Sequence, residues 1–277
     1  TVGEMSSTTL AHCQQYSQQD GRELSMVFNF HHLKVDYPNG EKWQLAAPDF
    51  IELKKIFAEW QNGLHQQGWS ALFWCNHDQP RIVSRFGHEG EYREKSAKML
   101  ATVLHMLQGT PYIYQGEEIG MTNPHFTQID DYRDVESLNI YLAHQTQGVA
   151  SEETLQTLAA RSRDNSRTPM QWDASTGAGF SQGTPWIPLS DNHAQINVTN
   201  ALADKASVFY HYQQLIQLRK QYPIIVEGNY QDLLPEHPTL WCYQRQHGEQ
   251  KLLVVANLSA TATTLKLPEN WQHTDSQ

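Results

Sequence analysis

The stretch Ala71-Leu72-Phe73-Trp74-Cys75-Asn76-His77-Asp78-Gln79-Pro80-Arg81 decides how the chain is interpreted. Its first five residues are apolar without alternation, which is typical of a strand buried on both faces. Asn76, His77 and Asp78 follow at once. An imidazole and a carboxylate at the carboxyl end of a buried parallel strand lie where α/β barrels and open α/β sheets place catalytic groups. By themselves these residues fit equally well a capped turn, in which Asn76 and Asp78 bond the local backbone.

Three further strands are predicted, and polar residues follow each of them. The predicted strand at residues 1–5 has Glu4 near its end. The one at residues 24–30 is followed by His31 and His32, and the one at residues 110–114 by Gln115, Glu117 and Glu118. Helical spacing is predicted between these strands at 10–16, where Ser6, Ser7 and Thr8 are cap candidates, at 48–66 and at 92–107. Alternating strands and helices imply a parallel sheet. The polar clusters favour a (β/α) barrel, while an open doubly wound sheet stays compatible with the pattern.

The remaining chain divides into an insertion, a helix and a strand-rich end. Periodicity weakens over about 122–205, apart from a helix expected at 152–160, and long excursions of this kind are often functional. Helical spacing returns at 208–219 and completes the last barrel unit. Alternating strands follow Pro223, most clearly at 240–243 and 252–256. We therefore predict an α/β protein: part of a catalytic barrel at 1–222, then the start of a small all-β domain at 223–277.

Composition excludes several classes of function. The chain has 277 residues, of which 39% are hydrophobic and 18% charged, and its net charge of −10 argues against nucleic-acid or membrane-surface binding. Cys13, Cys75 and Cys242 lie far apart without metal-ligand spacing, so we predict reduced thiols and no metal site. No apolar run is long enough to span a bilayer. We expect a cytoplasmic protein.

Four motifs occur in order: Val2-Gly3-Glu4, Asn76-His77-Asp78, the run 109–121 and the run 162–172. Over the whole chain they resemble the α-amylase family of retaining glycoside hydrolases, in its α-glucosidase branch. Within that branch, residues 28–34, 39–43 and 75–81 are most similar to enzymes that hydrolyse trehalose 6-phosphate. The resemblance implies a (β/α)8 barrel, a phosphorylated disaccharide as substrate and no cofactor.

The resemblance also implies roles for individual residues. Retaining glycosidases use two carboxyl groups about 5 to 5.5 Å apart, and Glu4 matches the acid/base. His77 and Asp78 match the pair that holds the ring hydroxyls and stabilises the transition state. Arg163 matches an arginine on the far side of the same ring, although an ion pair with Asp164 is an alternative. We interpret Arg167 as structural, and the adjacent Glu117 and Glu118 as loop anchors.

A basic loop suggests which substrate is bound. His31 stands where relatives acting on neutral oligosaccharides tend to carry an acid, and Lys34 and Lys42 follow it. An imidazole and two ammonium groups suit a dianionic phosphate in an otherwise acidic protein. Alternatively, the lysines are solvated and His31 only packs. The runner-up function is accordingly an oligo-1,6-glucosidase or general α-glucosidase, and a more distant one is a non-catalytic barrel homologue.

The nucleophilic aspartate of the family lies on the strand before Glu4, ahead of Thr1. The resemblance therefore places this chain in the C-terminal half of a (β/α)8 barrel. We expect half a barrel to expose a strand edge and an unfinished core. The chain alone is accordingly expected to be catalytically inactive and poorly stable.

Overall fold

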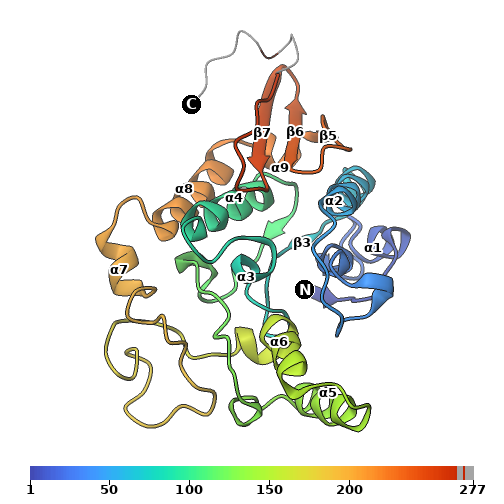
Figure 1. Cartoon of the computed structure of the whole chain (residues 1–277). Helices are drawn as coiled ribbons and strands as arrows, with labels where there is room; N and C mark the ends of the chain where they lie inside the picture. The colour runs from blue at the N-terminus through green and yellow to red at the C-terminus, as the bar shows by residue number, and fades with distance from the viewer. Residues whose placement is uncertain (267–270, 272–277) are drawn as a thin grey trace.

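A parallel sheet forms the centre of the molecule. The computed structural model describes residues 1–266 and 271. Strands β1 (Val2–Glu4) and β2 (Met26–Phe28) pair in parallel, as do β3 (Ala71–Leu72) and β4 (Thr110–Pro111). A parallel bridge between Val27 and Ser70 joins the two pairs, so the strand order is β1-β2-β3-β4. Figure 1 shows β3 at the middle of the molecule. The carboxyl ends of the four strands consequently lie at one edge.

The strands are shorter than the sequence predicts, yet the predicted burial is present. Regular pairing in β3 ends at Leu72, whereas Phe73, Trp74 and Cys75 remain almost fully buried. The indole Nε1 of Trp74 donates to the carbonyl of Leu100, 2.7 Å away. This bond satisfies the one polar group of a side chain that is wholly buried, so Trp74 fixes the strand against the following helix.

Helices cover the sheet and mostly follow the predicted spacing. They are α1 (Leu10–Tyr16), α2 (Phe50–Leu64), α3 (Ile82–Phe86), α4 (Arg93–His105) and α8 (Val208–Gln221), with 3₁₀ turns η1 (His31–Lys34) and η2 (Pro38–Gly40). The cap predicted for α1 at Ser6, Ser7 or Thr8 is wrong. Thr9 caps this helix, because its side chain accepts the His12 backbone N–H at 3.2 Å.

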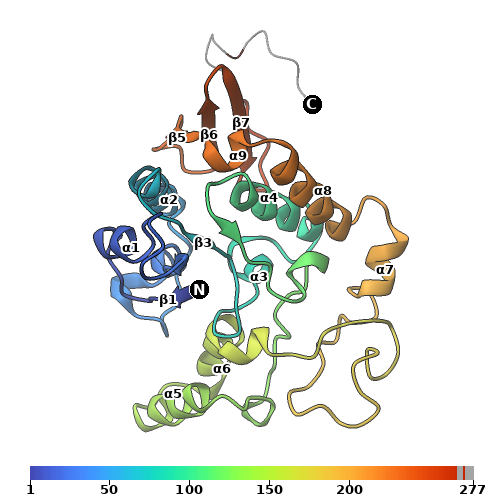
Figure 2. The same cartoon turned by 180° about the vertical axis from the view of Figure 1, so that it is seen from behind.

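A helical insertion lies between β4 and α8. It contains η3 (Glu117–Ile119), η4 (Ile129–Asp131), α5 (Val135–Thr146), α6 (Ser151–Arg161), η5 (Arg163–Ser166) and α7 (Val198–Ala203). The helix predicted at 152–160 is α6, whereas α5 is not predicted from the sequence. Val135 and Leu142 of α5 are 62% and 60% exposed, so its apolar residues do not mark one buried face. The pair α5–α6 lies at the end of the molecule opposite β5–β7 (Figure 2).

A buried ion-pair triad fastens the insertion to the barrel. Asp36 accepts two hydrogen bonds from Arg85 of α3, at 2.8 and 2.7 Å, and a further one from Arg161 at the end of α6. The three side chains are 2–4% exposed. Burial alone would raise the pKa of Asp36, but the two guanidinium groups outweigh it and hold that pKa below its usual value. The carboxylate therefore stays ionised and joins α3 to α6.

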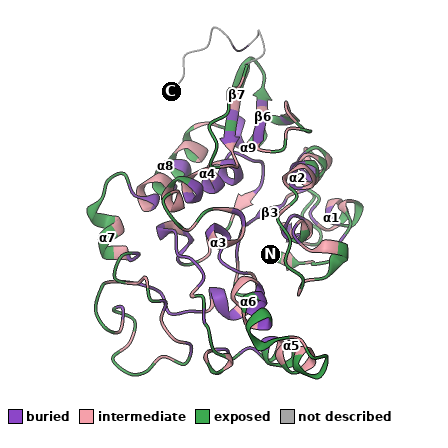
Figure 3. Cartoon of the chain, in the orientation of Figure 1, coloured by how far each residue is buried: buried purple, intermediate pink, exposed green. Residues whose placement is uncertain are grey.

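The C-terminal sheet packs directly on the barrel helices. After α9 (Ile224–Glu227), strands β5 (Asn229–Asp232), β6 (Leu240–His247) and β7 (Gln250–Asn257) form an antiparallel sheet in the order β5-β6-β7. Trp241 and Tyr243 belong to the same apolar cluster as Leu53 and Leu100. Buried residues accordingly continue from α4 into β6 (Figure 3). Residues 267–270 and 272–277 of the predicted β domain lie outside the described residues.

Candidate active site

The turn after β3 is both a capped turn and a place where His77 and Asp78 remain exposed, the two alternatives that the sequence allows. The side chain of Asn76 accepts the backbone N–H of Asp78 at 2.8 Å, so a capped turn is present. The same turn brings the imidazole of His77 within 3.6 Å of the carboxylate of Asp78. Their side chains are 63% and 31% exposed. The cap uses the Asn76 side chain and the Asp78 backbone, so it leaves the imidazole of His77 and the carboxylate of Asp78 accessible to a ligand.

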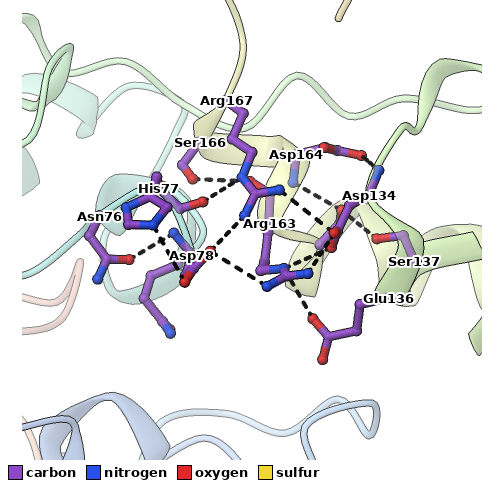
Figure 4. A network of polar contacts seen from close by, with 12 residues as sticks. Asn76, His77, Asp78, Asp134, Glu136, Ser137, Arg163, Asp164, Ser166 and Arg167 are labelled. Carbon is purple, nitrogen blue, oxygen red and sulfur yellow. Dashed lines mark hydrogen bonds and ion pairs between the residues drawn. The ribbon is translucent and has the colours of Figure 1, made fainter. Parts of the chain in front are cut away.

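Two arginines from the insertion converge on this turn (Figure 4). Arg167 forms an ion pair with Oδ1 of Asp78 at 2.6 Å and donates from Nε to the carbonyl of His77 at 2.7 Å. Arg163 lies farther from Asp78, at 3.6 Å. The sequence interpretation assigned Arg163 to the substrate and Arg167 to structure, whereas Arg167 is the arginine in closer contact with Asp78.

Arg163 is held by Asp134, a residue that sequence reasoning missed. Its Nε and Nη2 donate to the two carboxylate oxygens of Asp134, at 2.9 and 2.6 Å. Burial would raise the pKa of Asp134, but Arg163 and Arg167 outweigh it and keep that pKa below its usual value. The hydrogen bonds to Asp134 raise the pKa of Arg163 in turn. The pair is ionised, and the alternative partner Asp164 makes different bonds.

Asp164 aligns the backbone of the insertion. One of its oxygens accepts the N–H groups of Arg133 and Asp134, at 2.7 and 2.8 Å. Beside it, the hydroxyls of Ser162 and Ser137 share a 2.7 Å hydrogen bond. These contacts join the run 162–167 to the start of α5 (Figure 4). The two arginines are therefore presented to Asp78 from a fixed backbone.

Lys42 lies at the edge of the same cluster. Its ammonium group pairs with Glu136 at 2.6 Å, and Glu136 is 3.4 Å from Nε of Arg163. No motif in the sequence singled out Glu136. Lys42, which was predicted to bind phosphate, is thus connected to Arg163 through one carboxylate.

His31 and Lys34, predicted to act with Lys42, lie elsewhere. They line a groove between α1 and α2 that also contains Glu59 and Trp60. The His31 ring lies 5.2 Å from the Trp60 ring, centroid to centroid. Burial, with a smaller effect of Lys34, lowers the pKa of His31 and favours its neutral form. The structure therefore does not bring the three basic residues into one cluster.

Glu4 occupies the last position of β1, in register with Phe28 of β2. Its side chain is exposed, and within residues 1–266 and 271 it forms no hydrogen bond or ion pair. Beside it, the Phe28 ring contacts those of Phe73 and Tyr112, with centroids 5.0 and 4.6 Å apart. An apolar aromatic surface thus adjoins the carboxylate at the carboxyl edge of the sheet.

Glu117 and Arg81 are buried close to the candidate site. Glu117 accepts hydrogen bonds from the Tyr212 hydroxyl at 3.1 Å and the Tyr114 N–H at 3.2 Å. Burial raises the pKa of Glu117 to about 7. Arg81 donates to the carbonyl of Gln115 at 2.5 Å. These bonds fix the loop that follows β4, which agrees with an anchoring role for Glu117.

Two other kinds of site are absent from the part of the chain that the structure describes. Within residues 1–266 and 271, no group of three His, Cys, Asp or Glu residues is arranged to hold a metal ion. In the same part of the chain, no helix combines the length and the apolar character that crossing a membrane requires.

Sequence comparison identifies the class of protein. A family described as "Alpha amylase, catalytic domain" matches residues 1–228, and one described as "Alpha-amylase SusG C-terminal domain" matches residues 240–277. The chain belongs to the α-amylase family. The predicted fold class is confirmed: the chain forms part of a (β/α)8 barrel followed by a C-terminal antiparallel sheet.

Particular relatives narrow the comparison. A trehalose-6-phosphate hydrolase of Escherichia coli is 65% identical over 98% of this chain and 50% of its own length. An oligo-1,6-glucosidase of Bacillus cereus is 48% identical over 99% of this chain and 50% of its own length. The crystal structure of a Bacillus licheniformis trehalose-6-phosphate hydrolase superimposes with a TM-score of 0.95 at 58% identity, over 98% of this chain and 49% of that one. The chain spans about half the length of the relatives it matches.

Proposed function

We propose that this chain is part of a retaining α-glycoside hydrolase that cleaves trehalose 6-phosphate to glucose and glucose 6-phosphate. The observation that carries the proposal is the 65% identity to a trehalose-6-phosphate hydrolase over 98% of the chain. Glu4 ends the parallel strand β1 and the His77–Asp78 turn comes after the parallel strand β3, at the same edge of the sheet, as the proposed chemistry requires.

The proposed reaction has two displacement steps. Glu4 gives a proton to the glycosidic oxygen while a carboxylate nucleophile, expected on the strand that precedes β1, bonds to the anomeric carbon; the bond from that carbon to the glycosidic oxygen breaks and glucose 6-phosphate leaves. Glu4 then takes a proton from water, the water oxygen bonds to the anomeric carbon, and the bond to the nucleophile breaks, which releases glucose with its configuration retained. Asp78 and His77 hold ring hydroxyls, and the Asp78 carboxylate stabilises the positive charge that develops at the anomeric carbon.

Recognition of the phosphate is proposed for the loop that carries His31, Lys34 and Lys42. The structure supports the three residues to different degrees. Lys42 reaches Arg163 through Glu136, whereas His31 and Lys34 line a groove with Glu59. Carboxylates oppose a dianion at both places, Glu136 beside Lys42 and Glu59 in the groove. Lys42 is expected to contribute most because Glu136 links it to Arg163 and so to the residues around Asp78.

The experiment is to express the full coding region that contains this chain and to compare trehalose 6-phosphate with isomaltose as substrates. We expect a higher kcat/KM for trehalose 6-phosphate than for isomaltose. NMR should show that the glucose is initially the α-anomer, and Glu4→Gln should abolish hydrolysis. Initial release of the β-anomer would contradict retention. The 277-residue chain, assayed in parallel, is expected to show no hydrolysis.

A second candidate is an oligo-1,6-glucosidase. The 48% identity to the Bacillus cereus enzyme supports it, as does the separation of Lys42 from His31 and Lys34. A higher kcat/KM for isomaltose than for trehalose 6-phosphate would favour this candidate over the first.

A further inference from the structure

We propose that Arg167 is the positioning residue for Asp78, and that it holds this carboxylate in the orientation used by the substrate. The inference rests on the proposed function. It departs from the sequence, where Arg167 is interpreted as structural and Arg163 as the functional arginine. It is based on the different distances of the two guanidinium groups from the carboxylate of Asp78 (Figure 4).

Arg167 grips the turn after β3 at two points. One nitrogen lies 2.6 Å from Oδ1 of Asp78, and another donates to the carbonyl of His77 at 2.7 Å. Two contacts from a planar group fix both the backbone and the side-chain direction of Asp78. The second oxygen, Oδ2, is 3.6 Å from the imidazole of His77 and accepts no short hydrogen bond from the residues that the structure describes. This oxygen is therefore the one presented to a sugar hydroxyl.

Arg163 cannot substitute for Arg167 in this arrangement. Its Nε and Nη2 are occupied by Asp134, and its closest approach to Asp78 is 3.6 Å. Asp134 is also 3.6 Å from Arg167. The buried carboxylate thereby offsets the repulsion between two neighbouring cations. Each arginine then has its own partner, Asp134 for Arg163 and Asp78 for Arg167.

The backbone that carries Arg167 is itself held. Its N–H donates to the carbonyl of Asp164 at 3.0 Å, and the carbonyl of Ser166 accepts the Tyr114 hydroxyl at 3.0 Å. Tyr114 follows β4, the strand beside β3. The backbone at Arg167 is thus tied to the residues after β4, while the Arg167 side chain contacts the turn after the neighbouring strand, β3. Because its position is fixed before the substrate binds, it holds Asp78 without further ordering.

The test uses the protein expressed from the full coding region. Arg167→Gln and Arg167→Lys are both expected to lower kcat/KM on the hydrolysed substrate by about 10- to 100-fold, the range for removing a charge-assisted hydrogen bond. The loss should fall mainly on kcat, because Asp78 acts in the transition state. Added guanidinium should partly restore Arg167→Ala. Arg133→Ala is the matched control, since its side chain bonds loop carbonyls and not Asp78. Unchanged kinetics in Arg167→Gln would overturn the inference.

Two measurements separate this inference from the proposed function. In a protein that already carries Asp78→Asn, Arg167→Lys should cause no further loss of kcat/KM. If the loss in the double variant equals the product of the two single fold-losses, Arg167 does not act through Asp78. If the unaltered protein cleaves neither substrate, the proposed function fails and amide hydrogen exchange decides. Arg167→Gln must then accelerate exchange at residues 76–79 while Arg133→Ala does not. Equal exchange in the two variants would overturn the inference.

Discussion

Glu117 is a carboxylic acid enclosed by the fold, with Tyr212 and the Tyr114 backbone as its hydrogen-bond donors. Burial raises its pKa from 4.5 to about 7. The folded state therefore binds this proton more tightly than the unfolded chain. The stability that results is fully present below pH 4.5 and is lost as the pH rises through 7. A single residue thus makes the loop after β4 sensitive to pH near neutrality.

Replacing Glu117 with Gln should remove that sensitivity, because an amide of the same shape does not titrate. We expect Glu117→Gln to raise the free energy of unfolding at pH 8 relative to pH 5, by ~3 kcal/mol at most. Urea unfolding at the two pH values measures the effect. Glu52→Gln, on the exposed surface of α2, is the control. A Glu117→Gln effect that is equal at both pH values would contradict the prediction.

The separation of the basic residues leads to a second prediction at this scale. Lys42→Ala should raise KM for trehalose 6-phosphate by about 10-fold, as expected for one lost ion-paired hydrogen bond, and leave KM for isomaltose unchanged. Lys34→Ala should have the smaller effect, because Lys34 lines the groove between α1 and α2, whereas Lys42 is linked through Glu136 to Arg163. Steady-state kinetics of the two variants on both substrates provide the measurement. An effect of Lys34→Ala that equals or exceeds that of Lys42→Ala would show that the groove binds the phosphate.

At the scale of elements, the attachment of the insertion depends on one carboxylate. Asp36 joins Arg85 of α3 to Arg161 of α6, and Ser162 and Arg163 follow Arg161 directly. The position of Arg163 and Arg167 is thereby linked to a triad outside the site. The pKa of Asp36 lies below its usual value, so its contribution to stability is lost only as the pH falls through that lowered pKa.

Asp36→Asn should destabilise the protein strongly, because it leaves two buried guanidinium groups without a counter-charge. The expected cost is about 3–5 kcal/mol in urea unfolding at pH 7. Limited proteolysis should cleave within 122–205 faster than in the unaltered protein. Asp20→Asn removes the exposed partner of Arg22 and should cost less than ~1 kcal/mol. Equal destabilisation by the two substitutions would refute the role given to the triad.

The sequence predicted those elements whose apolar residues share one buried face. Helices α2, α4, α6 and α8 follow that spacing. Helix α5 does not, because Val135, Leu138 and Leu142 are exposed while Ile140 and Tyr141 pack inwards. In the site, the turn at 76–78 was predictable from the buried run before it. The contacts of Asp134 and Arg167 were not, because they join segments far apart in the chain. The loop after β2 also folds into two 3₁₀ turns, which separate His31 from Lys42.

At the scale of the whole molecule, the barrel helices and the C-terminal sheet share one core. Lys54 of α2 is fully buried, and its ammonium donates to three carbonyls, two from the segment before β6 and one from its first residue: Leu234 at 2.6 Å, His237 at 2.7 Å and Leu240 at 3.2 Å. The hydroxyl of Tyr243 in β6 also donates to the carbonyl of Val103 in α4, at 2.8 Å. Polar and apolar contacts therefore cross the interface together.

Lys54→Met should consequently weaken both regions at once. Native-state hydrogen exchange is expected to show equal reductions in the opening free energy of β6 and α4, of about 1–3 kcal/mol for the unsatisfied carbonyls. Lys55→Met is the matched control, since Lys55 is 73% exposed on the same helix. A reduction confined to β6 would mean that the sheet opens independently of the barrel.

The three carbonyls that surround Lys54 also bear on how such proteins can be recombined. A chimera joined at Pro223 would take its sheet from one parent and its α2 from another. The ammonium would then face a loop whose carbonyls were arranged for a different helix, at the cost of a buried charge without acceptors. In this chain the sheet is not an exchangeable module, and any functional swap has to carry α2 with it.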